Sequence, residues 1–360
     1  MEPIQEGQRG QDPVVREDSD VAEPRGERLL SNSVAEDQSR AKDSSIASPT
    51  QVAQPGSSDS LKGQVRDFWN VQSCDTQVAR ASRFSREYFE QIEGFRYFDQ
   101  SFIHSFAQFT RYRGKRLLEV GFGAGTDFIQ WLRAGARVSG VDLTEEAIEN
   151  VRHRIEVYGL PTPENLQVAD AENLPFESDT FDLGYSFGVL HHTPNTEKAL
   201  RELVRVIRPG GELKIMLYNR HSIAIINRWV RFGLLKGRPW RSLRWIMWNM
   251  IESPGTKGYT SRELIRMLTA ARLRNIHVRT EITSADYLAA SASAPLKWLY
   301  RRAIQLAGYH FGWLPGQYVE RVNDPGSRTH THLHAGDPHR ALVTGNPLGF
   351  FHCISAEKEG

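Results

Sequence analysis

Residues 117–127 read LLEVGFGAGTD, and this stretch decides the fold class of the chain. A short apolar run surrounds Glu119, and glycine then takes alternate positions at Gly121, Gly123 and Gly125. An apolar run bounded by glycines is typical of a buried parallel strand, and glycine lets the backbone turn sharply and approach a ligand closely. The stretch therefore predicts a strand, a tight loop and a helix N-terminus, as at the ligand end of a doubly wound α/β sheet.

Composition limits the class of protein. The 360 residues are 39% hydrophobic and 24% charged with a net charge of +2, which suits a soluble globular protein and does not favour nucleic-acid binding. Two cysteines, Cys74 and Cys353, are too few for a disulfide framework, a four-thiolate metal site or an iron–sulfur cluster, and they fit a reducing cytoplasm. The first residues do not resemble a signal peptide, and no apolar run approaches the length of a membrane span.

Shifts in composition divide the chain into seven segments. In order we predict a disordered tail (1–60), an aromatic-rich helical cap (61–114), a core of five strands (115–220), a basic aromatic helical insertion (221–254), a continuation of the core (255–285), a second insertion (286–345) and a last strand with the C-terminus (346–360). The tail has no periodic apolar positions, so it cannot bury enough surface to offset its ordering entropy. For the aromatic residues of the cap, core packing is favoured over a lid above a ligand pocket.

Strands and helices alternate from residue 115 onward. The predicted strands are 117–120, 137–141, 166–169, 181–187, 212–217, 276–282 and 348–356. The predicted helices between them are 126–134, 144–158, 196–207 and 259–268, with a further helix near 296–306. Five strands joined by helices of this length predict an α/β fold with a right-handed, Rossmann-like parallel sheet covered on both faces.

The residues at the strand ends describe the ligand. A dinucleotide fingerprint needs glycine where Thr126 stands, and a carboxylate such as Glu119 is unfavourable beside a pyrophosphate. An acidic strand end suits an amine or another positive charge. Asp142 ends the second strand, where an acidic residue accepts hydrogen bonds from ribose hydroxyls, and Asp170 follows the third strand, near an adenine edge. The ligand so described carries a ribose, an adenine and a cationic tail.

Four motifs in this order resemble one family. EVGFGAG, VDLT, DAENLPFESDTFDLGYSFGVLHH and LRELVRVIRPGGELKIMLYN together are similar to class I S-adenosylmethionine-dependent methyltransferases, of the type 11 kind that includes ubiquinone and menaquinone C-methyltransferases. The resemblance covers about residues 115–219, is weaker over 256–282 and 348–356, and implies a seven-stranded, mostly parallel sheet. In this family the last strand is antiparallel and lies beside the fifth.

The resemblance also implies the cofactor, S-adenosyl-L-methionine, and the residues that bind it. These are Glu119, Gly121, Gly123 and Gly125 at the methionine end, Asp142 at the ribose, Asp170 and Ala171 at the adenine, Leu143 nearby, and Ser186 beside the reacting sulfonium. The alternative is that these carboxylates are solvated loop residues and the glycines simple turns.

The methyl acceptor is less well defined. Methyl transfer requires an oriented acceptor, the exclusion of water and, for a hydroxyl or acidic carbon, the removal of a proton. His191 and His192 follow the fourth strand and could act as that base near neutral pH, or could simply pack against the following loop. Residues 218–220, Tyr-Asn-Arg, could equally line the acceptor site.

The insertion at 221–254 departs from the family pattern. No acidic residue lies between Glu212 and Glu252, whereas arginine, lysine and tryptophan are frequent. A basic aromatic segment can lie on an anionic membrane surface or hold an anionic substrate, and the alternative is a lid with solvated arginines. Nucleic acid is not expected, because SFGVLHH stands where amino-methylating DNA enzymes carry an Asp/Asn-Pro-Pro-Tyr/Phe signature.

A histidine-rich stretch is interpreted as a surface loop without metal. It contains His330, His332, His334 and His339, and no other metal-ligand pattern lies near it in sequence. We therefore expect a cytoplasmic methyltransferase, in contact with the membrane at most peripherally, that acts on a small-molecule or lipid- or saccharide-linked acceptor. Two alternatives stay open: a non-catalytic cofactor-binding scaffold and, disfavoured by Thr126 and Glu119, a nicotinamide-dependent oxidoreductase.

Overall fold

The sheet that the sequence predicts is present in the computed structural model, which describes residues 58–71, 73–287, 302 and 341–360. Residues 1–57 of the predicted tail, the helix expected near 296–306 and the histidine-rich stretch lie outside the described residues, apart from Arg302. Within the described residues the first helix, α2, begins at Ser58.

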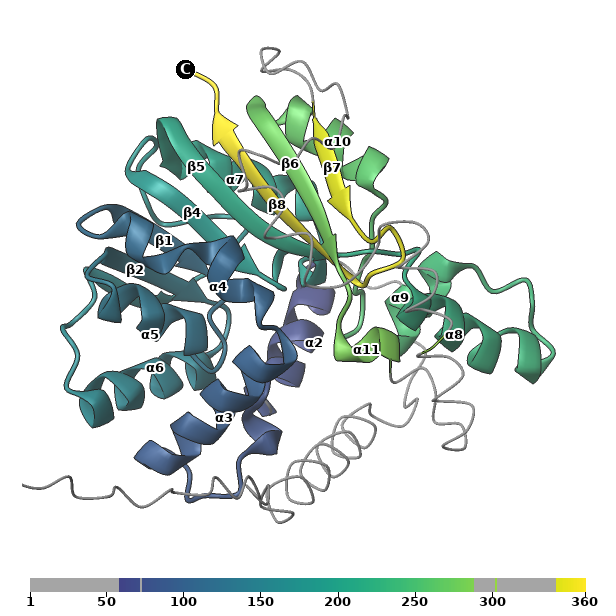
Figure 1. Cartoon of the computed structure of the whole chain (residues 1–360), viewed down its shortest axis with the longest axis horizontal. Coiled ribbons are helices and arrows are strands. Elements are labelled where there is room, and N and C mark those ends of the chain that lie inside the picture. Colours follow the sequence, from purple (N-terminus) through teal and green to yellow (C-terminus); the bar gives the residue numbers. More distant parts are fainter. Residues whose placement is uncertain (1–57, 72, 288–301, 303–340) are drawn as a thin grey trace, which may run out of the picture. The chain divides into compact units, whose positions relative to one another are not determined.

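Eight strands of the described chain form one sheet in the order β3-β2-β1-β4-β5-β8-β6-β7 (Figure 1). Their bounds are β1 Arg116–Val120, β2 Arg137–Asp142, β3 Asn165–Val168, β4 Phe181–Phe187, β5 Ile207–Tyr218, β6 Leu273–Glu281, β7 Leu342–Gly345 and β8 Phe351–Lys358. Strands β1 to β5 are parallel, and β8 is antiparallel to both β5 and β6. The seven predicted strands and the antiparallel last strand are confirmed. The short β7, parallel to β6 at the sheet edge, is an addition from the segment interpreted as an insertion.

The start of β5 differs from the prediction. The sequence Pro209-Gly210-Gly211 indicated a turn between helix and strand, whereas β5 already begins at Ile207. The register explains both observations, because Phe181 pairs with Ile207 while Leu183 pairs with Glu212. The Pro-Gly-Gly run is therefore a bulge inside the strand, and Gly210 takes a positive φ of 71° there.

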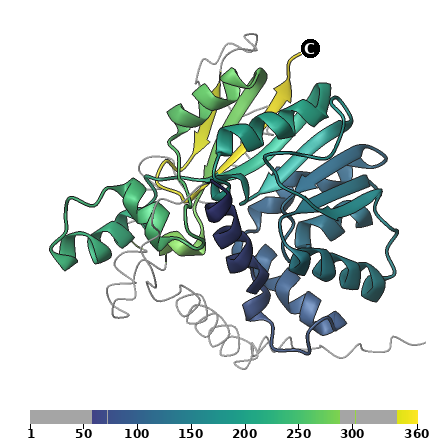
Figure 2. The same ribbon diagram turned by 180° about the vertical axis from the view of Figure 1, so that it is seen from behind.

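Helices cover both faces of the sheet, as Figures 1 and 2 show from opposite sides. One face packs against α4 (Phe102–Ala107), α5 (Thr126–Arg133) and α6 (Glu145–Tyr158), and the other against α7 (Thr196–Val206) and α10 (Ser261–Ala270). Local signals set the helix ends. Thr144 caps α6 by accepting a hydrogen bond from the amide of Ala147, and Thr260 and Glu263 form a reciprocal capping box at α10.

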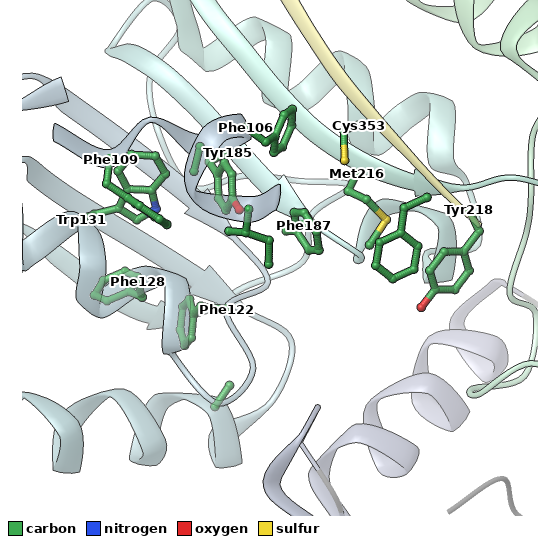
Figure 3. Packing of buried hydrophobic residues seen from close by; sticks show 14 of the residues in the cluster. Phe106, Phe109, Phe122, Phe128, Trp131, Tyr185, Phe187, Met216, Tyr218 and Cys353 are labelled. Carbon is green, nitrogen blue, oxygen red and sulfur yellow. The ribbon is translucent and has the colours of Figure 1, made fainter. Parts of the chain in front are cut away.

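Aromatic side chains fill the core under α4 and α5. Trp131, Phe109 and Tyr185 pack edge to face or tilted, with ring centroids 4.4 and 5.1 Å from that of Trp131. Figure 3 shows the labelled side chains along this face of the sheet, from Phe109 and Trp131 to Tyr218 at the end of β5. Core packing thus accounts for most of the buried aromatic residues, although Phe98 of α3 (Arg86–Asp99) is 77% exposed.

The segment 221–254 forms α8 (Ile223–Phe232), the 3-10 helix η4 (Leu234–Lys236) and α9 (Leu243–Met250). Both views place α8 and α9 beside the strand ends, away from α5 and α6 (Figures 1 and 2). Ile225 of α8 and Ile246 of α9 are fully buried in the core. These two side chains therefore anchor the segment to the rest of the protein.

Candidate active site

The three glycines after β1 have different roles. Gly121, Gly123 and Gly125 all have positive φ values, of 74°, 50° and 76°. A Cβ on Gly121 would lie 2.3 Å from a methyl group of Val189, and one on Gly125 would lie 2.6 Å from a methyl group of Val151, so both glycines allow close packing. A Cβ on Gly123 would meet nothing closer than Cys74, at 3.9 Å. Gly123 is therefore the least crowded of the three glycines, with room for a side chain in ordinary contact with Cys74.

The acidic end of β2 is connected directly to this loop. The Gly123 amide donates to Asp142 Oδ2 over 3.1 Å, and the amide and hydroxyl of Thr144 donate to Asp142 Oδ1 over 3.0 and 2.8 Å. Burial raises the pKa of Asp142, and these hydrogen bonds partly offset that effect. Leu143, which stands between Asp142 and Thr144 in the chain, is half-buried. The structure thus brings the predicted ribose ligand and the glycine loop together.

Glu119 lies at the end of β1 with its side chain almost fully buried. Its Oε2 atom accepts no hydrogen bond from the part of the chain that the structure describes. Burial and the nearby Asp127 raise the pKa of Glu119 well above its usual range. A buried carboxyl oxygen without a hydrogen-bond partner is costly, and a cationic ligand would supply the missing interaction.

A buried charge cluster, which the sequence did not reveal, supports the glycine loop. Asp127, in the first turn of α5, forms a two-pronged ion pair with Arg96 of α3, over 3.1 and 2.8 Å. The hydroxyls of Tyr97 and Tyr185 also donate to Asp127, over 3.1 and 2.8 Å. Although burial acts in the opposite direction, these donors hold the pKa of Asp127 below its usual value. Arg96 therefore fixes α3 against the start of α5.

Asp170, which follows β3, is already engaged by the chain. Lys62 of α2 (Ser58–Val71) places its Nζ 2.7 Å from Asp170 and 3.0 Å from Glu172, while Ala171 is buried between them. Although burial acts in the opposite direction, the two carboxylates raise the pKa of Lys62. Helix α2 thus lies over the predicted adenine position, and a ligand that binds Asp170 there has to share this carboxylate with Lys62.

Ser186, near the end of β4, is fully buried and its hydroxyl donates to the carbonyl of Val120 over 2.8 Å. This bond joins the ends of β1 and β4. The hydroxyl hydrogen of Ser186 is therefore already used in a hydrogen bond to β1.

Comparisons with known proteins agree with this geometry. Residues 118–215 match a family described as a methyltransferase domain. This range contains the glycine loop, Asp142, Asp170 and the end of β4. The chain contains a methyltransferase domain of type 11.

Two curated relatives match part of the chain. Methyltransferase GfsG of Streptomyces halstedii is 36% identical over 104 residues, which are 28% of this chain and 37% of that protein. Phosphatidylethanolamine N-methyltransferase of Cereibacter sphaeroides is 35% identical over 29% of this chain and 51% of that protein. The crystal structure of the [4+2]-cyclase SpnF has 16% identity and a TM-score of 0.44, and the match covers 86% of this chain and 98% of that one. The chain thus matches about half, or less, of the length of these two curated relatives.

S-adenosylmethionine is the methyl donor of this family. The residues of the methyltransferase domain fit such a ligand at three points: the uncrowded backbone at Gly123, the carboxylate of Asp142 beside it, and the Glu119 Oε2 atom, which has no hydrogen-bond partner among the described residues. The residue-by-residue assignment of Glu119, Gly121, Gly123, Gly125, Asp142, Leu143, Asp170, Ala171 and Ser186 stays a prediction.

His191 follows β4 in the methyltransferase domain and is fully buried. Its ring packs against Tyr218 with centroids 3.9 Å apart, and neither ring nitrogen has a hydrogen-bond partner among the described residues. Burial, with a further contribution from His192 and Lys257, lowers the pKa of His191 well below its usual value. At neutral pH the ring is therefore uncharged.

His192 has a different environment. Its Nδ1 lies 2.9 Å from the hydroxyls of both Thr256 and Ser253. The Thr256 hydroxyl also donates to the carbonyl of Ser253 over 2.7 Å. The His192 Nε2 atom lies 3.4 Å from Glu252 Oε2. His192 therefore has polar neighbours at both ring nitrogens, whereas His191 has no hydrogen-bond partner among the described residues.

Glu252 completes this group, and sequence reasoning treated it only as the end of the basic insertion. Its side chain is 38% exposed, and it accepts a hydrogen bond from the Tyr218 hydroxyl over 2.9 Å. Although burial acts in the opposite direction, His192 and Tyr218 hold the pKa of Glu252 below its usual value. Trp69 of α2 packs on His192 with ring centroids 5.4 Å apart. Glu252 lies near the end of the 221–254 insertion, and nothing in the sequence signalled this role for it.

The other residues proposed to line the acceptor site have structural contacts. Asn219 donates to the carbonyls of Pro347 and Gly349, and Arg220 forms a two-pronged ion pair with Glu263. Tyr218 is therefore the member of this trio that contacts the histidines.

Two further features concern metals and membranes. The described residues contain no group of three or more histidine, cysteine or acidic side chains placed to hold a metal ion. Within the same part of the chain, every helix is too short or too polar to cross a bilayer.

Proposed function

We propose that this chain transfers a methyl group from S-adenosylmethionine to a small-molecule or lipid acceptor. The single observation that carries the proposal is the hydrogen bond from the Gly123 amide to Asp142, because it joins the glycine loop to an acidic strand end. The buried carboxyl group of Glu119, at the end of β1, has no hydrogen-bond partner for its Oε2 atom among the described residues and suits the cationic part of the donor.

The chain's own residues would position the reactants and accept a proton. When bound, the cofactor supplies an electrophilic methyl group. His192 is the group proposed to take a proton from the acceptor, since polar neighbours hold its ring and Glu252 lies beside it. The Glu252 carboxylate, 3.4 Å away, stabilises the resulting imidazolium. His191 and Tyr218 pack beside this pair and keep water away from it.

Transfer of a labelled methyl group tests the proposal. The full chain is incubated with methyl-labelled S-adenosylmethionine and fractions of a cell extract, and we expect label in a small-molecule or lipid fraction. Cofactor binding without label in any fraction supports the scaffold alternative. In calorimetry, tight NADH binding with no response to S-adenosylmethionine or S-adenosylhomocysteine supports the oxidoreductase. Asp142→Ala serves as the control that should abolish both cofactor binding and transfer.

The 221–254 segment supports a second, finer proposal: that the protein works at the anionic cytoplasmic surface of a membrane. Leu234, Leu235 and Trp240 are 49%, 75% and 77% exposed between α8 and α9. Basic residues surround them in sequence, among them Lys236 and Arg238. Exposed apolar tips between basic side chains suit insertion among anionic head groups.

Vesicle flotation tests this contact. The full chain should float with phosphatidylcholine vesicles that contain phosphatidylserine, and less with phosphatidylcholine alone or at high salt. The variants Leu235→Asp and Trp240→Asp should float less. Phe98→Asp, which changes an equally exposed aromatic residue on α3, should behave like the unmodified chain. Equal flotation of all variants, or none at low salt, contradicts the proposal.

A further inference from the structure

A cavity of 580 Å³ lies between α7, α9 and α10. Leu200, Met267 and Ala270 line it from the two helices that cover the sheet, while Met247 and Trp248 line it from α9. Its volume is in the range of small-molecule sites, which bury most of a ligand of moderate size. The proposed cofactor residues, including the glycine loop and Asp142, do not line it.

The charged residues of this cavity are unevenly balanced. Five basic side chains line it, those of Arg201, Arg220, Arg244, Lys257 and Arg266, against the two acidic side chains of Glu197 and Glu263. Glu263 alone binds two of the guanidinium groups, since Arg220 and Arg244 both lie within 2.9 Å of it. The cavity therefore keeps an excess of positive charge.

Lys257 and Arg266 provide that excess. In the described part of the chain neither has a carboxylate within ion-pair distance. The Lys257 ammonium donates instead to the carbonyls of Thr193, over 2.5 Å, and Gly255, over 3.4 Å. Burial lowers the pKa of Lys257 to about 8, and Glu172 only partly offsets this. The ammonium also lies 5.6 Å from the centroid of the Trp248 ring. A partly buried ammonium that has carbonyls and a ring beside it but no carboxylate gains most from an anion.

The remaining wall is apolar. The side chains of Leu200, Met247, Trp248 and Met267 supply a flexible and polarisable surface that accommodates alkyl chains or flat rings. A ligand that satisfies both parts of the cavity has one anionic group and an apolar body.

We propose that this cavity binds an anionic amphiphile, with a phosphate or carboxylate group held by Lys257 and Arg266 and an apolar body against Met247, Trp248 and Met267. The site goes beyond the proposed methyl transfer and does not depend on it. Thr256 connects the two regions, because it lines the cavity and also bonds His192. The proposed cofactor residues do not line the cavity, so the ligand is assayed without the cofactor.

Calorimetry with the full chain tests the site. The probes are dodecyl phosphate and dodecanoate, both below their micellar concentrations, with inorganic phosphate and dodecyl maltoside as the head-group and neutral controls. We expect at least one anionic amphiphile to bind tighter than either control. Lys257→Gln and Arg266→Gln should each weaken it about tenfold, the effect of losing a charged hydrogen bond. Arg262→Gln, an exposed change on the same helix outside the cavity, should leave affinity unchanged.

Met267→Trp, which fills the cavity, should also weaken binding, while S-adenosylhomocysteine binding stays unchanged in every variant. The inference is overturned if neither anionic amphiphile binds, or if dodecyl maltoside or inorganic phosphate binds as tightly. It is equally overturned if Arg262→Gln weakens binding as much as the cavity variants. Because S-adenosylhomocysteine is titrated in parallel, failure here is distinguishable from failure of the proposed methyl transfer.

Discussion

The cofactor side and the acceptor side of this active site are built in different ways. On the cofactor side, backbone amides a few residues away bind the carboxylates, as with Asp142 and Thr144 or Asp170 and Glu172. On the acceptor side, His192 is held by Ser253 and Thr256, which are 61 and 64 positions away in the chain. The first arrangement is specified by local sequence, and the second depends on how the 221–254 segment returns to the sheet.

This difference indicates which part of the chain can vary. A loop whose hydrogen bonds are local keeps its geometry when distant segments change. A histidine whose partners come from an insertion changes its environment with that insertion. The acceptor side is therefore where we expect specificity to reside, and the following experiments test this contrast.

The largest effect is expected from His192→Gln. Loss of a general base lowers kcat about 10²- to 10⁴-fold when the acceptor must lose a proton. The assay uses the acceptor found by labelling, and S-adenosylhomocysteine affinity should stay unchanged. His153→Gln, on an exposed part of α6, is the matched control. An unaltered kcat shows that His192 has only a packing role. The cofactor side and the acceptor side would then differ in structure but not in this catalytic function.

Arg96→Met tests the cofactor side through stability. Without the guanidinium, Asp127 stays buried next to Glu119 with tyrosine donors only, so the free energy of unfolding should fall by about 3 kcal/mol. Urea unfolding measures this change. Arg83→Met breaks the exposed pair with Glu146 and should cost less than about 1 kcal/mol. Equal losses in the two variants contradict the supporting role of the buried cluster.

The sequence predicted those parts that local chemistry determines. The start of α6 next to Thr144, Asp142 at the end of β2 and the limits of β4 depend on residues within a few positions of each other. The Arg96–Asp127 pair spans 31 positions, so no pattern in either helix reveals it. Glu252 was missed for the same reason, since its contacts with His192 and Tyr218 arise only after the insertion has folded.

A smaller effect on stability is expected from the titration of Glu263, in the first turn of α10. Arg220 and the capping interactions at Thr260 outweigh burial and lower the pKa of Glu263 to about 2. The folded-state pKa lies below the unfolded one, so the stabilisation is complete above about pH 4.5 and is lost as the pH falls towards 2. Glu263→Gln should cost about 1 kcal/mol at pH 7, with the difference shrinking on acidification. A difference independent of pH in urea unfolding contradicts this account.

The smallest effect is expected from Lys62→Met. Because Lys62 occupies Asp170, its removal frees this carboxylate, and S-adenosylhomocysteine should bind about threefold more tightly, which corresponds to breaking one exposed ion pair. Lys62→Arg keeps the charge and should resemble the unmodified chain. Weaker binding in Lys62→Met indicates instead that α2 contributes to the cofactor side, which makes that side less local than described above.

The position of β8 has a consequence for the timing of folding during synthesis. This strand lies between β5 and β6 and pairs with both, although it follows β6 in the chain by about 70 positions. On the ribosome, β6 and β7 cannot join the sheet until residues 351–358 have emerged, so the nascent protein exposes an open edge at β5 until then. Such late, non-local pairing is slow and leaves the edge open to association with other chains. A helper protein that shields β5 during translation would raise the yield of this chain more than one that acts on the finished polypeptide.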